Sequence, residues 1–129
     1  MVAVDTNVVV RFLVRDDLKQ AARSASLIHD GSVWVSKTVF LETEWVLRSL
    51  YRLAPEAIAG ALQAFAGLPN VVLEDELSVA KALDWFKAGL DFADALHLAS
   101  AGKATRFATF DRKLARRAQP LTAVEIAAL

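Results

Sequence analysis

The sequence predicts an α/β fold, a single domain over residues 1–129 with a short parallel β-sheet of four or five strands flanked by helices on both faces. Short runs rich in β-branched and aromatic residues alternate with longer amphipathic segments, which is the pattern of a parallel sheet covered by helices. The 129 residues, 55% hydrophobic and 23% charged, suffice for one domain with a substantial core but not for two ordinary domains.

The predicted strands are short, and the first of them opens the chain. Residues 1–4 are apolar and end at Asp5, which is too short a run for the hydrophobic region of a signal peptide, so we expect a buried strand. The second strand, over 32–36, is bounded by Gly31 and Lys37. Similar runs predict strands over 71–74 and 106–110, with 121–124 as a candidate fifth strand.

Helices are predicted between these strands from amphipathic spacing and from residues that favour helix ends. Asn7 is a candidate N-cap of the first helix, and Gly31 ends the second. Pro55 suits the first position of the fourth helix, and Asp91 is a candidate N-cap of the sixth. The predicted helices cover residues 7–17, 17–31, 37–53, 55–70, 75–89, 90–104 and 111–118.

Composition narrows the functional classes. The chain has no cysteine, which excludes disulfides and thiolate metal sites. It also has no run of the roughly 18 apolar residues that can cross a bilayer, so we expect a soluble, cytoplasmic protein with no membrane partner. With 15 basic and 15 acidic side chains the net charge is zero, and a site for a polyanion has to come from local clustering.

Acidic side chains fall where an α/β sheet gathers its ligands, beyond the carboxyl ends of the strands. Asp5 directly follows the first strand, and Asp111 directly follows the fourth. Glu42 lies near the start of the helix after the second strand, and Asp94 lies one turn into the helix that precedes the fourth. A single Asp at such a junction often serves only as an N-cap. Four acids from four segments nevertheless predict a carboxylate site on one side of the sheet.

Two of these acids have a close acidic neighbour. Glu44 has Arg48 four residues ahead and is predicted to form an ordinary surface ion pair. Glu42 has only apolar or hydroxyl neighbours one turn away and is the better candidate for chemistry. Asp94 lies among apolar residues, so its burial needs a reason. Asp91, three positions before it, is either a ligand or a helix cap.

Converging carboxylates repel one another, and a bound cation is the simplest way to relieve that repulsion. Oxygen ligands without cysteine, in a chain whose histidines lack metal-ligand spacing, suit Mg²⁺ or Mn²⁺ rather than Zn²⁺. The acidic positions therefore predict a site for a hard divalent cation.

Four segments resemble the acidic motifs of PIN-domain ribonucleases, and more narrowly those of the VapC-type toxins of prokaryotic toxin–antitoxin pairs. The segments are VDTNVVVRFL, LETEWVLRSLY, DFADALHLASA and FATFDRKL, and they follow one another in the family's order and spacing. Matching the motif positions assigns the metal-binding and catalytic acids to Asp5, Glu42, Asp94 and Asp111. The neighbouring polar positions of the site match Asn7, Thr109 and the frequently acidic position Asp91.

The resemblance implies a metal-dependent endoribonuclease with one or two Mg²⁺ or Mn²⁺ ions, hydrolysing RNA phosphodiester bonds. It also implies a homodimer and a cognate VapB-type antitoxin that occludes the acidic groove. Basic residues beside the acidic motifs are typical of a phosphate track, although the wet face of an amphipathic helix also explains any one of them. The candidates for binding RNA are Arg11, Arg15, Arg112 and Arg116.

Three alternative functions also place acids at strand ends or use the same surface. A Mg²⁺-dependent phosphatase usually has a second acid two residues after its nucleophilic Asp, and Asn7 occupies that place here. A receiver-like phosphoryl-transfer domain has paired acids early and a Lys late after a strand, a pattern that this chain does not show. A non-catalytic RNA- or protein-binding relative would not need all four acids.

Overall fold

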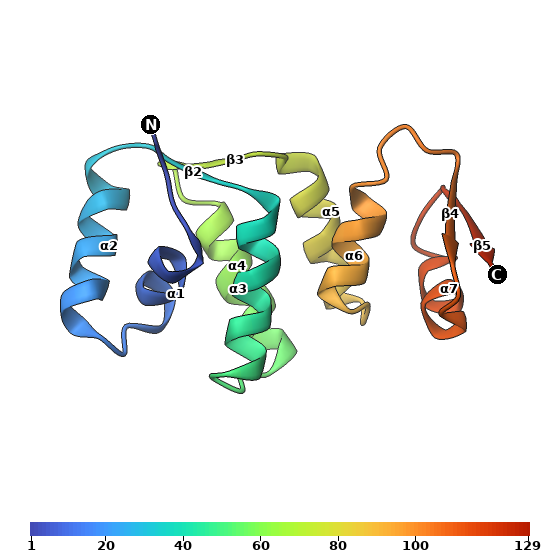
Figure 1. Ribbon diagram of the computed structural model, residues 1–129, viewed down its shortest axis with the longest axis horizontal. Coiled ribbons are helices and arrows are strands. Elements are labelled where there is room, and N and C mark those ends of the chain that lie inside the picture. The colour runs from blue at the N-terminus through green and yellow to red at the C-terminus, as the bar shows by residue number, and fades with distance from the viewer. The chain divides into compact units, whose positions relative to one another are not determined.

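The computed structural model describes residues 1–129 and confirms the α/β class, with seven helices and five strands (Figure 1). All paired strands are parallel, as predicted, and they form a sheet of three strands, β1-β2-β3, and a sheet of two, β4-β5. None of the helices combines the length and the apolar character needed to cross a membrane. The elements are β1 (Val2–Ala3), α1 (Thr6–Val14), α2 (Leu18–Asp30), β2 (Val33–Val35), α3 (Lys37–Ser49), α4 (Pro55–Ala66), β3 (Val71–Leu73), α5 (Glu76–Lys87), α6 (Phe92–Ala99), β4 (Arg106–Thr109), α7 (Arg112–Ala118) and β5 (Glu125–Ala128).

The chain divides into two compact units, and the first, Met1–Glu76, holds the three-stranded sheet and helices α1 to α4. β2 is the central strand of this sheet, with Val33 paired to Val2 of β1 and to Val71 of β3. Val33 and Val35 are almost completely buried. Burial of these side chains explains why so short an apolar run forms the middle strand.

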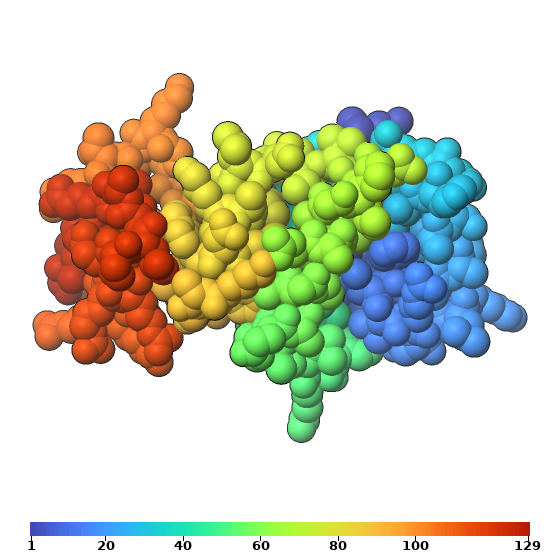
Figure 2. Space-filling model, turned by 180° about the vertical axis from the view of Figure 1, so that it is seen from behind, coloured from blue at the N-terminus to red at the C-terminus, as the bar shows by residue number.

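Aromatic rings join the helices of the first unit. The ring centroid of Phe65 in α4 lies 5.9 Å from that of Phe12 in α1 and 6.2 Å from that of Phe40 in α3. Figure 2 shows the blue surface of α1 beside the green surface of α4. Phe40 and Phe65 are each 1% exposed, and burial of a Phe side chain contributes roughly 1.5–3 kcal/mol. These contacts pack α1 and α3 against α4.

Asp5, and not Asn7, is the N-cap of α1. The backbone of Asp5 is extended, and its carboxylate accepts a hydrogen bond from the N–H of Val8. The prediction for Asn7 was wrong because α1 begins at Thr6, so that Asn7 already lies in the first turn. Pro55 begins α4, as predicted.

The second unit, Leu77–Leu129, contains the rest of α5, helices α6 and α7, and the two-stranded sheet. Phe86 of α5 and Phe92 of α6 meet edge to face with ring centroids 5.4 Å apart. The hydroxyl of Ser78 in α5 donates a 3.1 Å hydrogen bond to the carbonyl of Ala99, the last residue of α6. Asp91 is the N-cap of α6, as predicted.

The fifth strand covers Glu125–Ala128 and not the predicted residues 121–124. The N–H groups of Leu121 and Thr122 donate to the carbonyl of Ala118, and the hydroxyl of Thr122 accepts from the N–H of Val124. These bonds make a turn and occupy the donors that a strand would need. Only after the turn does the chain pair with β4, in parallel register.

Candidate active site

In the first unit, the predicted site begins where β1 leads into α1. Asp5 is exposed, and its Oδ1 accepts a 3.3 Å hydrogen bond from the N–H of Val8. The second carboxylate oxygen of Asp5 has no partner in the protein. Asn7 follows in the first turn of α1 and is also exposed. Asp5 therefore acts as a helix cap and keeps one oxygen available for another ligand.

Glu42 and Glu44 lie on different sides of α3, and the structure corrects part of the prediction for them. Glu42 is exposed and forms no ion pair. Glu44 is 2% exposed, and its Oε2 accepts a 2.8 Å hydrogen bond from the Nε of Arg48. The prediction of an ordinary surface pair at Glu44 was wrong. Phe40 and Leu47, one turn to either side, are each 1% exposed, so Glu44 belongs to the buried stripe of α3.

In the second unit, two of the predicted acids cap helices. The Oδ2 of Asp91 accepts a 3.2 Å hydrogen bond from the N–H of Asp94 in the first turn of α6. The Oδ1 of Asp111 accepts a 3.0 Å hydrogen bond from the N–H of Leu114 in α7. The hydroxyl of Thr109 accepts a 3.0 Å hydrogen bond from the N–H of Asp111 and thereby fixes the backbone at this cap. Asp111 is exposed despite these contacts.

The electrostatic effect of this grouping falls on Asp94, which is half-buried. Burial raises the pKa of Asp94 above its ordinary value, and the negative charges of Asp91 and Asp111 raise it further. The exposed His97 opposes the shift. The ionised form of Asp94 is therefore disfavoured here, and a nearby cation would favour it.

Two of the predicted RNA-binding residues lie on α7, directly after Asp111. Arg112 and Arg116 are both exposed, and their spacing of four residues places them on one face of the helix. Neither forms an ion pair. Arg117, in contrast, donates from Nη1 to the carbonyl of Gly89 at 3.2 Å. Arg112 and Arg116 therefore keep their charge available to an anion, whereas Arg117 braces the loop before α6.

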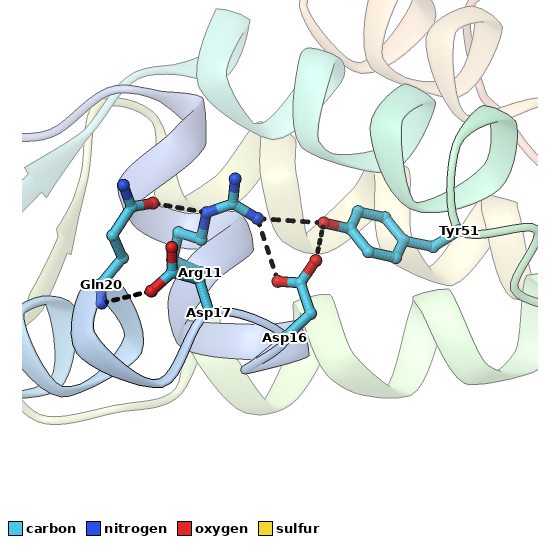
Figure 3. A network of polar contacts seen from close by, with 5 residues as sticks. All are labelled: Arg11, Asp16, Asp17, Gln20 and Tyr51. Carbon is cyan, nitrogen blue, oxygen red and sulfur yellow. Dashed lines mark hydrogen bonds and ion pairs between the residues drawn. The ribbon is translucent and has the colours of Figure 1, made fainter.

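Arg11, a third predicted RNA-binding residue, is the centre of a polar network (Figure 3). Its Nε donates to Oε1 of Gln20 at 2.7 Å. Its Nη1 donates to Oδ1 of Asp16 at 2.9 Å and to the hydroxyl of Tyr51 at 3.2 Å. Tyr51 donates its own hydroxyl proton to Oδ2 of Asp16 at 2.8 Å. The network joins α1, the turn before α2 and the segment after α3.

The same network shifts the ionisation of its members. The hydrogen bond from Tyr51 lowers the pKa of Asp16; partial burial opposes this effect, and the charge of Arg11 adds to it. The bond to Asp16, together with burial, raises the pKa of Tyr51. Burial lowers the pKa of Arg11, but Asp16 and Tyr51 outweigh burial and leave it raised. At neutral pH the network therefore has one fixed charge pattern, with Arg11 and Asp16 ionised and Tyr51 protonated.

Arg15, the fourth predicted RNA-binding residue, ends α1. Its backbone is left-handed, with φ 61°, and its N–H donates to the carbonyl of Arg11 at 3.2 Å. Its guanidinium carbon lies 5.7 Å from the ring centroid of Phe12, in a cation–π contact. Arg15 therefore has a structural role at the helix end, and its contact with RNA stays a prediction.

Neither unit contains three or more carboxylate or imidazole groups close enough together to hold a metal ion. The donor chemistry nevertheless fits Mg²⁺ or Mn²⁺, because the candidate ligands are carboxylates. Asp94 also has neighbouring acids that raise its pKa, and a divalent cation would neutralise that repulsion. The residues present therefore match the predicted ion in chemical type.

The comparison with protein families supplies the deciding observation, because residues 2–120 match the PIN domain. The chain belongs to the PIN domain family. PIN domains are generally metal-dependent nucleases, and the match extends over both compact units and all four acidic motifs. No curated protein matches the chain in a direct sequence search. The resemblance to PIN domains is thus confirmed, and the narrower resemblance to VapC-type toxins is a separate question.

Two features of this PIN domain differ from, or go beyond, what the sequence predicts. The buried position of Glu44 had a readable signal, since Phe40, Glu44 and Leu47 follow the helical spacing of an apolar stripe. The network around Arg11 had no comparable signal. Tyr51 lies 40 residues after Arg11 in the sequence, and only the packing of α1 against α3 brings the two side chains together.

Proposed function

We propose that this PIN domain is a metal-dependent endoribonuclease and the toxin component of a VapBC-type toxin–antitoxin pair. Family membership supports the nuclease activity. The observation that supports it most directly is the pKa of Asp94, which burial, Asp91 and Asp111 all raise. A carboxylate whose pKa is raised by burial and by neighbouring acids is typical of a functional site. The order and spacing of the four motifs support the toxin role.

In this proposal, one or two Mg²⁺ or Mn²⁺ ions would be held by Asp5, Glu42, Asp94 and Asp111. A bound ion supplies a water of lowered pKa and stabilises the charge that develops on the leaving oxygen. The hydroxyl of Thr109 and the helix N-terminus of α7 hold Asp111 in a fixed orientation.

The remaining residues of the proposed site hold the RNA. Arg112 and Arg116 lie on one exposed face of α7 and would bind phosphates of the backbone. Arg11 and Arg15 would do the same at α1. Because these contacts are to phosphates, they position the RNA and do not select its sequence.

We also propose two protein partners, a second copy of the chain and a VapB-type antitoxin that covers the acidic groove. The resemblance of the motifs supports both. Exposed apolar side chains near the end of α3 also support a protein partner, with Trp45 51% and Leu50 67% exposed. Protein–protein contact sites often contain exposed apolar side chains of this kind.

Cleavage assays with purified protein test the proposed activity. RNA, p-nitrophenyl phosphate and acetyl phosphate are incubated with the protein in Mg²⁺, in Mn²⁺ and in a chelator. We expect metal-dependent cleavage of RNA alone, and loss of that cleavage in Asp5→Asn and Asp94→Asn. Asp84→Asn, a change to an exposed acid of α5 outside the motifs, is the matched control and should cleave normally.

Three results would contradict the proposal. Full activity in Asp5→Asn or Asp94→Asn would remove these acids from the site. Hydrolysis of the phosphomonoester would favour the phosphatase, and RNA binding without cleavage would favour the non-catalytic alternative.

The toxin role has its own test, which is brief induction in bacterial cells followed by mapping of new RNA ends. Normal growth with intact RNA, for a protein that cleaves RNA when purified, would leave a nuclease that is not a toxin.

A further inference from the structure

A cavity of about 350 Å³ with a mixed polar and apolar lining lies along α1 and α2 in the first unit. Its lining contains two guanidinium groups, two side-chain amides and a hydroxyl, and no carboxylate. The N–H of Val8, one of the lining residues, donates to the carboxylate of Asp5, so the cavity adjoins this candidate acid. The lining residues are Asn7, Val8, Arg11, Gln20, Arg23, Ser24 and Leu27.

The network of Figure 3 holds the guanidinium of Arg11 in place but leaves one of its nitrogen atoms without a hydrogen-bond acceptor. The Nε and Nη1 atoms of Arg11 donate to Gln20, Asp16 and Tyr51, whereas Nη2 has no partner in the protein. The bond from Arg11 also fixes the amide of Gln20, because it occupies Oε1 and leaves Nε2 unbonded. Figure 3 shows Nη2 of Arg11 and Nε2 of Gln20 on the same side of the network, away from Asp16.

Arg23 adds the second positive charge to this cavity. It lies three residues after Gln20 on α2, so both side chains are on one face of that helix. Arg23 is exposed and forms no ion pair in the protein. Asn7 and Arg11, four residues apart, are the corresponding pair on α1. Donors from two helices therefore meet at one cavity.

The polar side chains that line this cavity match a phosphate group. The non-bridging oxygens of a phosphodiester only accept hydrogen bonds, and guanidinium donors bind them strongly and directionally. A guanidinium that is already held in place loses less conformational entropy when it binds. The cavity also lies next to Asp5, where the proposed activity would cleave RNA.

We propose that this cavity is a subsite for an internal phosphate of RNA, bound by Arg11, Gln20 and Arg23 beside the bond that is cleaved. The inference rests on the proposed ribonuclease function. It assigns Arg23 and Gln20 to RNA binding and gives the network of Asp16 and Tyr51 a purpose, which is to orient Arg11 toward the phosphate.

Nuclear magnetic resonance of the full-length protein in a chelator tests occupancy without cleavage. The probe is a short RNA with hydroxyl groups at both ends, so that all of its phosphates are internal. We expect this RNA to shift the side-chain amide signals of Gln20 and Asn7 and the Nε–H signal of Arg11. Shifts elsewhere in the protein without shifts at these groups would overturn the proposal. Shifts caused only by inorganic phosphate or by a 5′-phosphorylated RNA would assign the cavity to a free or terminal phosphate and would also overturn it.

Charge removal on α2 gives a second test. Arg23→Gln should weaken RNA binding, and the loss of one phosphate contact should reduce the slope of log K against log salt by about 0.7 for a single strand. Lys19→Gln removes one charge from the same helix at an exposed position outside the cavity, and should leave that slope unchanged. Equal effects of the two changes would show that RNA responds only to the overall positive charge of α2, and would contradict a specific phosphate site in the cavity. Failure of the wild-type protein to cleave RNA would remove the proposed function, whereas the resonance shifts report on the cavity separately.

Discussion

Replacement of Glu44 by Gln tests the buried ion pair of α3. The side chain of Glu44 is 2% exposed, whereas that of Arg48 is 49% exposed, so folding removes water mainly from the glutamate. Gln keeps one oxygen that can accept from Nε of Arg48 but loses the negative charge. The bond from Nε of Arg48 stays charge-assisted through the guanidinium, but the 3.4 Å bond from Nη2 of Arg48 to Oε1 of Glu44 is lost, and one hydrogen bond contributes about 0.5–1.5 kcal/mol. We therefore expect Glu44→Gln to lower the free energy of unfolding by about 1 kcal/mol.

Removal of the arginine should have a larger effect than removal of the glutamate. Arg48→Gln leaves the buried carboxylate of Glu44 without this charged partner, and breaking a buried pair in this way costs about 3–5 kcal/mol. Half-exposure of Arg48 places the expected loss near the lower end of this range, about 3 kcal/mol. Glu42→Gln, at the exposed glutamate of the same helix, should change stability by less than about 0.5 kcal/mol.

We expect the loss of stability to be largest in Arg48→Gln, smaller in Glu44→Gln and smallest in Glu42→Gln. Urea unfolding followed by circular dichroism measures these losses, and thermal unfolding checks them. A loss of 1 kcal/mol corresponds to a fall in Tm of roughly 3–6 °C for a chain of this size. Greater destabilisation by Glu42→Gln than by Glu44→Gln, or an unchanged stability in Arg48→Gln, would contradict a stabilising ion pair between Glu44 and Arg48. The same two glutamate variants separate stability from chemistry. Glu42→Gln should slow RNA cleavage at least about tenfold, equivalent to roughly 1.4 kcal/mol, and Glu44→Gln should leave cleavage near the wild-type rate.

Three further predictions concern charged side chains and one hydroxyl that bonds to them. The pKa of Asp94 is raised on folding, so folded protein binds more protons than unfolded protein, and the contribution of Asp94 to stability falls as pH rises from about 4 through the raised pKa. Asp94→Asn should therefore raise Tm at pH 7 without metal but not at pH 3; equal effects at both pH values would contradict this. Charge reversal of Arg112 or Arg116 should weaken RNA binding and flatten its salt dependence, and an unchanged salt slope would leave them as solvated surface residues. Tyr51→Phe should lower Tm slightly, because the hydroxyl joins Arg11 to Asp16, and an unchanged Tm would show that the network is not stabilising.

The helix starts show which parts of this fold local sequence rules can predict. Pro55 and Asp91 were placed correctly because each is the only strong helix-start residue at its position. The prediction for Asn7 was wrong because Asp5 is an equally good N-cap and stands directly before the first residue of α1. The fifth strand depends on pairing with β4, a contact distant in sequence, and so the pattern of residues 121–124 could not locate it.

The candidate site divides in the same way. The positions of the acids follow from the ends of strands and the starts of helices, which the sequence pattern indicates. The different environments of Glu42 and Glu44 depend on which face of α3 is buried, and the apolar stripe through Phe40 and Leu47 could have revealed it. The orientation of Arg11 depends on Tyr51, which comes from another helix end and has no local signature.

Capping and metal binding are compatible roles for the same carboxylate, and this decides which substitutions are informative. Asp5, Asp91 and Asp111 each use one oxygen to accept from a backbone N–H in the first turn of a helix. An alanine substitution would remove the cap and the charge together, and loss of the cap alone costs about 0.5–2 kcal/mol. Asparagine keeps an acceptor of equal capping strength and removes only the charge. Loss of RNA cleavage in Asp5→Asn at unchanged stability can therefore be assigned to the missing charge, whereas the same loss in Asp5→Ala could equally come from a frayed α1.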